Sequence, residues 1–272
     1  MAPFDLDQGK LSVRVSEGVF YQLLADISDF DFKKSDGSEN PNAFFNQLLP
    51  NLILYRLNKR KNLRAYLENN IIHCIKENYQ EKLLDFMDDL FDYSYFDDGD
   101  EHYHRETFHF RLNKANIIKL QCFFEELESQ QRNKTSYLRN LFNEYANMRK
   151  DKRECICFNK EYSVLCHAID DKRSITCSFK GENYSLIPYR VDLNYVDGSL
   201  YLLALEKEKP HICHVFRLCW LRNVIKKDFC EFEFNDETVD KLEYLIYEYD
   251  YTGKETINLS EIEIKNLSKR HD

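Results

Sequence analysis

The 272-residue chain is longer than a typical single domain, and its 43% hydrophobic and 31% charged residues favour a folded protein over a disordered one. It has no GxxxxGK[ST], GxGxxG or GxSxG motif, which argues against P-loop, dinucleotide-binding and α/β-hydrolase chemistry. It also shows neither a membrane-length apolar run nor an export signal, so we expect a soluble, cytoplasmic protein with reduced cysteines.

Charge is distributed unevenly along the chain. The net charge of −9 is concentrated in residues 85–106 and 228–272, whereas residues 56–64 and 132–160 are locally basic. The basic segments have two interpretations, a solvated helix face or a face that contacts phosphate.

The amino-terminal half repeats the order strand, helix, helix. Residues 10–15 and 107–112 each alternate apolar and polar side chains, as half-buried strands do. A helical pattern follows each strand, and a second helix begins near Asn40 in the first copy and near Asn133 in the second. Because one strand alone cannot bury its apolar face, we expect the two strands to pair antiparallel within the chain.

Each copy resembles a ribbon-helix-helix module, over residues 10–58 and 105–150, with residues 50–91 read as a helical insert that covers the core. The resemblance implies a pseudo-dimeric domain over residues 1–152, whose ribbon would enter the DNA major groove. The side chains expected to face outward from the ribbon are Lys10, Ser12, Arg14, Thr107, His109 and Arg111. Alternatively the ribbon is only a scaffold, because the acidic residues 85–106 adjoin its second strand and would repel phosphate.

From residue 155 the sequence changes to short alternating segments. They predict strands over residues 155–158, 163–169, 174–179, 184–195, 199–206 and 211–218. Asp197-Gly198 stands between two of these segments and is a strong hairpin signal. Strands of this number and length suggest a small, strongly bent barrel.

Residues 188–205, with the Phe216-Arg217 pair that follows, resemble the WYL domain family, and the resemblance covers residues 153–230. Leu200-Tyr201-Leu202 stands where that family has Trp-Tyr-Leu. The resemblance implies an Sm/SH3-like β-barrel that binds nucleic acid or senses a ligand. The matching pocket positions in this chain are Arg190, Tyr201, Arg217 and Arg222.

Chemistry supports these positions, since arginines suit phosphate oxygens and tyrosines can stack on unpaired bases. Two alternatives remain: Tyr201 is ordinary barrel packing, and the anionic partner of Arg217 is an internal carboxylate. Residues 231–272, with a helical pattern over 236–249, are interpreted as a dimerisation element of a homodimer, or as a segment that packs back on its own barrel.

Catalytic and metal-dependent chemistry is set aside. The Cys155-x-Cys157 and His211-x-Cys213 pairs lack zinc-site spacing, and residues 97–100 lack the ligands of a calcium loop. His102 and the histidines near it lie on opposite faces of one segment. We therefore expect no metal, no cofactor and no enzymatic activity.

The predicted fold class is α+β: a ribbon-helix-helix-like domain, a WYL barrel and a dimerising tail. This order resembles the WYL accessory proteins of type VI-D CRISPR systems. The resemblance implies binding of single-stranded RNA, stimulation of a type VI RNA-guided, RNA-cleaving effector protein, and no membrane partner. One alternative is a transcription regulator that binds duplex DNA through the ribbon and senses a ligand through the barrel. Another is a scaffold that docks on the effector.

Overall fold

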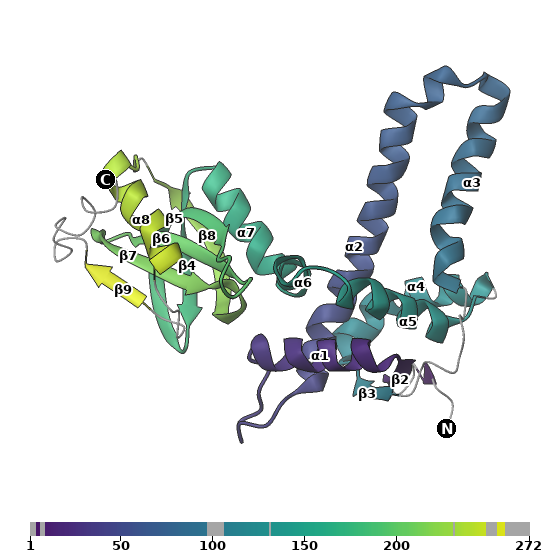
Figure 1. Ribbon diagram of the computed structural model, residues 1–272, viewed down its shortest axis with the longest axis horizontal. Helices are drawn as coiled ribbons and strands as arrows, with labels where there is room; N and C mark the ends of the chain where they lie inside the picture. Colours follow the sequence, from purple (N-terminus) through teal and green to yellow (C-terminus); the bar gives the residue numbers. More distant parts are fainter. Residues whose placement is uncertain are drawn as a thin grey trace. The chain divides into compact units, whose positions relative to one another are not determined.

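The structure of the protein is a computed structural model that describes residues 4–5, 9–96, 106–130, 132–230, 232–248 and 255–258 (Figure 1). The chain divides into two compact units, Met1–Met148 and Arg149–Asp272. The acidic turn at residues 97–100 and the histidine segment around His102 lie outside the described residues.

The first unit contains a three-stranded antiparallel sheet. Its strands β1 (Phe4–Asp5), β2 (Lys10–Val15) and β3 (Glu106–Arg111) lie in the order β1-β2-β3. The predicted pairing of the two long strands is confirmed, with Leu11 opposite Phe110 and Val13 opposite Phe108. Those four side chains are buried, so the period-two pattern identified the inward face correctly.

Two helices follow each of the long strands, as predicted. The helices and the short 3-10 turn of this unit are α1 (Glu17–Asp29), α2 (Pro41–Asn70), η1 (Ile72–Cys74), α3 (Glu77–Phe96), α4 (Lys114–Ser129) and α5 (Lys134–Ala146). Aromatic rings fill the space between helices and ribbon. Phe45 of α2 stacks on Phe110 at 4.2 Å between ring centroids and contacts Phe142 of α5 at 5.4 Å. This packing joins both copies of the repeat into one core.

The insert differs from its prediction. Pro50 does not begin a helix but lies inside α2, which continues to Asn70, and α2 and α3 form a hairpin that extends away from the core (Figure 1). Proline leaves the carbonyl four residues earlier without its helical donor. Here that carbonyl, Asn46 O, accepts from Asn116 Nδ2 at 2.6 Å. This replacement bond explains how α2 passes through Pro50 without ending.

The second unit is a meandering antiparallel sheet with helices before and after it. Its elements are α6 (Lys150–Cys157), α7 (Asn159–Asp170), β4 (Arg173–Phe179), β5 (Glu182–Leu193), β6 (Leu200–Glu206), β7 (Lys209–Arg217), η3 (Leu218–Trp220), β8 (Leu221–Phe229), α8 (Asp236–Glu248) and β9 (Glu255–Asn258). The strand order is β8-β4-β5-β6-β7-β9, so β8 returns to pair with the first strand of the sheet. Register shifts in three ladders provide the bends that a small curved sheet needs.

Two predicted strands are wrong. Residues 155–158 belong largely to α6, and residues 163–169 lie in α7. Short segments rich in Cys, Ile and Val show the same apolar content in helices and strands, and only the spacing separates them. In α7 the buried residues are Leu165 and Ala168, three apart, which is the helical spacing.

The described part of the tail packs on its own unit. Leu242, Leu245 and Ile246 of α8 are buried in one cluster with Ile187 and Tyr201 of the sheet. β9 pairs with β7. The structure therefore has the second of the two arrangements considered for residues 231–272, while the homodimer stays a prediction. Among the described residues no helix is long and apolar enough to span a membrane.

Candidate nucleic-acid-binding sites

The six outward positions of the ribbon come together on one face. The register places Lys10 opposite Arg111, Ser12 opposite His109, and Arg14 opposite Thr107. Ser12 Oγ and His109 Nδ1 lie 3.1 Å apart across the two strands. The face therefore carries three cations and three side chains capable of hydrogen bonding. Its binding of nucleic acid stays a prediction.

Helix side chains that the sequence did not single out anchor this ribbon. Arg139 Nε donates to Arg14 O at 3.0 Å, and Asn42 Oδ1 accepts from Arg111 N at 2.9 Å. Asn46 Nδ2 donates to Arg111 O at 2.7 Å. These bonds hold the backbone under two of the outward arginines. The sequence signal for them is weak, because asparagines within the first turns of a helix usually indicate capping.

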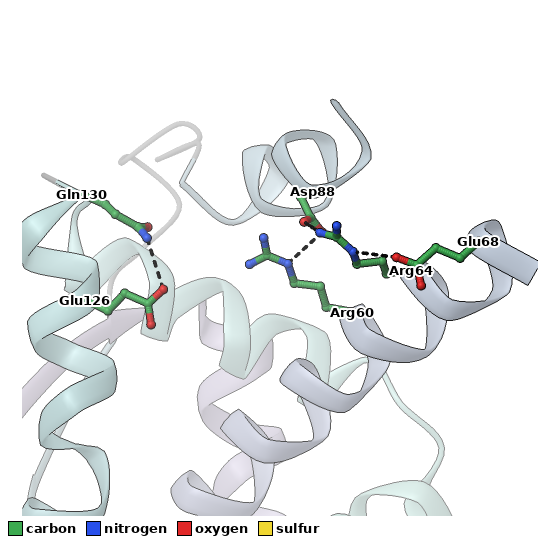
Figure 2. A network of polar contacts seen from close by, with 6 residues as sticks. All are labelled: Arg60, Arg64, Glu68, Asp88, Glu126 and Gln130. Carbon is green, nitrogen blue, oxygen red and sulfur yellow. Dashed lines mark hydrogen bonds and ion pairs between the residues drawn. The ribbon is translucent and has the colours of Figure 1, made fainter. Parts of the chain in front are cut away.

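The basic segment over residues 56–64 is engaged within the fold. Asp88 of α3 accepts from Arg60 Nε at 3.0 Å and from Arg64 Nη1 at 2.9 Å, and Arg64 Nε also donates to Glu68 (Figure 2). Hydrogen bonding to Arg60 lowers the pKa of the Asp88 carboxyl below its ordinary value. The same view includes a hydrogen bond at the end of α4, from Gln130, the residue after the helix, to Glu126. The clamp on Asp88 links α2 to α3, so it supports neither of the interpretations that the sequence suggested for these arginines.

Three of the four pocket positions predicted in the second unit already have partners within the fold. Arg190 pairs with Asp192 and Glu243, and Arg222 Nη1 donates to the carbonyls of Cys219 and Leu221. Tyr201 is 1% exposed and donates its hydroxyl to Asp197 Oδ2 at 2.7 Å. Burial raises the pKa of Tyr201 above its ordinary value. Tyr201 is therefore core packing, which is the alternative considered for it.

Arg217 is different, because in the described part of the chain two of its donor atoms are unused and it has no ion pair, whereas Arg190 leaves only Nε without an acceptor and pairs with two carboxylates. The Nε and Nη2 atoms of Arg217 are buried and have no hydrogen-bond acceptor, and its Cζ lies 5.3 Å from the centroid of the Trp220 ring. The Nε1 of Trp220 is likewise buried without an acceptor, and Lys180 Nζ lies 4.6 Å from the same ring. Buried donors without acceptors cost about 1–3 kcal/mol each. We name Arg217, Trp220 and Lys180 the Arg217 cluster.

The sequence interpretation missed two members of this cluster. Trp220 is the single tryptophan of the chain and follows Arg217 by three residues, a spacing that could have pointed to it. Lys180 lies in the turn after β4 with a positive φ of 48°, and nothing in its sequence context distinguishes it from other turn lysines.

A buried carboxylate lies beneath the cluster. Glu154 of α6 is fully buried and accepts from Leu200 N at 2.8 Å and from Cys219 N at 3.1 Å. Burial raises the pKa of Glu154 to about 7, while the positive charge of Arg217 acts in the opposite direction. Glu154 thus joins α6 to the start of β6 and to η3, the turn that carries Trp220. It was missed because α6 was predicted as a strand.

The cysteines are free thiols, and some of them are buried in the sheet of the second unit. All nine lie in the described residues and none is in a disulfide. Burial raises the pKa of Cys177 and of Cys213 to about 12, which keeps both thiols protonated at neutral pH. Within the described residues no three His, Cys, Asp or Glu side chains gather as a metal site requires.

Comparison with known proteins adds a likeness of fold. No family model matches the chain, and no curated protein does. Among solved structures, it is similar to one described as the crystal structure of a CRISPR Cas-related protein, with a TM-score of 0.62 and 15% sequence identity. The match covers 93% of this chain and 74% of the other. It therefore extends across both units.

Proposed function

We propose that this chain is a non-catalytic accessory of a CRISPR system that binds single-stranded RNA through the Arg217 cluster and modulates a type VI RNA-cleaving effector. The observation that carries the proposal is the set of buried donors on Arg217 and Trp220 that no protein acceptor satisfies. Similarity of the fold to a CRISPR Cas-related protein supports the CRISPR association. The WYL and ribbon-helix-helix resemblances of the sequence support the nucleic-acid role.

The cluster offers the contacts that an unpaired nucleotide needs. A phosphate oxygen would accept from Arg217 Nε and Nη2, which a guanidinium presents side by side, once the half-buried side chain turns toward solvent. Trp220 supplies an indole N–H and a ring on which a base can stack, and Lys180 adds a second positive charge beside that ring. Binding of this type gives little sequence specificity and depends strongly on salt.

Fluorescence anisotropy tests the proposal. The full chain is titrated into matched single-stranded RNA, single-stranded DNA and duplex DNA at two salt concentrations. We expect single-stranded RNA to bind most tightly and Arg217→Ala to weaken it at least about tenfold. The matched control is Arg190→Ala, because Arg190 already pairs with Asp192 and Glu243. Equal loss in both variants, or no loss in either, would contradict the assignment.

A second candidate is a transcription regulator that reads duplex DNA. The observation that favours it is the exposed ribbon face, which carries Lys10 opposite Arg111 at one end and Arg14 at the other. In that case duplex DNA would bind best, and Arg14→Ala would weaken it while Arg217→Ala would not. The same anisotropy series separates the two candidates. Stimulation of the effector is then tested by adding wild type or Arg217→Ala to its RNA-cleavage reaction.

A further inference from the structure

A pocket of about 410 Å³ opens on the second unit, away from the Arg217 cluster. It includes Arg173, the first residue of β4, whereas Trp220 of the cluster contacts Phe179, the last residue of that strand. Six steps along a strand correspond to about 20 Å. The pocket is therefore a separate site, and its volume falls in the range of small-molecule sites.

One side of this pocket is aromatic. Tyr189 of β5 lies 4.9 Å from Phe234, and Phe234 lies 5.1 Å from Phe232, measured between ring centroids. All three rings pack on the buried core of the unit but stay partly exposed. Such rings are held rigidly and still offer surface to a planar ligand.

The polar lining is of two kinds. Lys172 and Arg173 are exposed at the start of β4, and the guanidinium of Arg173 uses Nη1 on Lys227 O at 3.3 Å and retains further donors. Glu233 adds one exposed carboxylate among the aromatic residues. Cations suit a phosphate, and a carboxylate can accept from the hydroxyls of a ribose.

We propose that this pocket binds a ribonucleoside monophosphate. The base would lie against Tyr189 and Phe234, the phosphate at Lys172 and Arg173, and a ribose hydroxyl at Glu233. The nucleotide is either free or the 5′-phosphorylated end of an RNA chain. The inference goes beyond the function proposed above, because it adds a second site, and only its RNA-end form rests on RNA being the partner.

Isothermal titration calorimetry of the full chain with adenosine monophosphate, its 2′-deoxy analogue, adenosine and inorganic phosphate tests the site. We expect adenosine monophosphate to bind and the other three to bind about tenfold more weakly or worse. Lys172→Asn should weaken binding about tenfold, and asparagine tolerates the positive φ of 52° at this position. The matched control is Lys209→Asn, an exposed lysine at the start of β7 that lines neither this pocket nor the Arg217 cluster.

A 5′-phosphorylated RNA pentamer distinguishes the free nucleotide from the end of an RNA chain. It is titrated into the Arg217→Ala variant and into the double variant that also carries Lys172→Asn. Pentamer binding that depends on Lys172 assigns the RNA end, and mononucleotide binding that depends on Lys172 assigns the free ligand. The inference is overturned if neither ligand binds at millimolar concentration, or if Lys172→Asn leaves both unchanged. If Lys180→Asn impairs only the longer RNA and Lys172→Asn only the nucleotide, both sites stand. If one of the two sites fails its test, binding at the other site can still be measured.

Discussion

The buried carboxylate of Glu154 makes a specific prediction about stability and pH. Burial raises its pKa from the ordinary 4.5 to about 7. Between pH 4.5 and pH 7 the carboxyl of Glu154 is therefore mostly protonated in the folded unit and mostly ionised in the unfolded chain. Stability is therefore greatest below pH 4.5 as far as this group is concerned, and it falls as the pH rises to 7. The full difference is about 3 kcal/mol.

Substitution of Glu154 isolates this effect. Glu154→Gln removes the titration but cannot accept from both Leu200 N and Cys219 N, so we expect it to be the less stable protein at pH 5. Between pH 5 and pH 8 the wild type should lose roughly 2–3 kcal/mol relative to the variant.

Urea unfolding followed by the fluorescence of Trp220 measures this difference, because the single tryptophan reports on the second unit alone. Comparison of two proteins at each pH cancels the other titrating groups. Glu208→Gln, in the exposed turn before β7, is the control and should follow the wild type at both pH values. A difference between wild type and Glu154→Gln that stays constant within about 0.5 kcal/mol would refute the reasoning.

Three further outcomes are expected in the first unit. Phe45→Ala removes the ring that stacks on Phe110, and thermal unfolding should show a loss of about 3–5 kcal/mol. Asn46→Ala deprives Asn113 N of its acceptor and Asn116 Nδ2 of a partner, and chemical unfolding should show a loss of about 1–3 kcal/mol that Asn70→Ala, an exposed helix control, does not share. Asp88→Asn should cost less than about 1 kcal/mol at neutral pH. Because the pKa of Asp88 is lowered in the fold, its contribution is fully present above the ordinary value of 3.8 and declines as the pH falls through the lowered pKa, so the difference between the two proteins should be smaller at pH 3 than at pH 7.

Periodicity along the chain was sufficient to predict the ribbon. Residues 10–15 and 107–112 alternate over six positions, so their inward faces and their antiparallel pairing followed from the need to bury Val13 and Phe108. The connection at Asp197-Gly198 was likewise identified by its turn residues, since β5 ends at Leu193 before it and β6 begins at Leu200 after it.

Long-range contacts could not be predicted in the same way. The continuation of α2 through Pro50 depends on Asn116, which lies 70 positions after the carbonyl that it serves. The roles of Arg217 and Arg222 differ because Arg222 reaches two carbonyls that lie within three residues of it in the chain, whereas Arg217 reaches no acceptor with Nε or Nη2. Both residues are arginines beside apolar neighbours, and only coordinates reveal which donors are already used.

Glu154 and the Arg217 cluster are coupled through charge and through the backbone. The Glu154 side chain accepts a hydrogen bond from Cys219 N, which lies in the turn that carries Trp220. The charge of Arg217 also interacts with that carboxylate. A phosphate bound at Arg217 would bring a negative charge near Glu154 and raise the pKa of that carboxyl further. By linkage, proton uptake at Glu154 must then strengthen phosphate binding, so RNA should bind more tightly at pH 6 than at pH 8. Anisotropy titrations at both pH values test this coupling, since Glu154→Gln should lose that part of the pH dependence while it keeps the salt dependence. An unchanged pH dependence in the variant would place the coupling on another group.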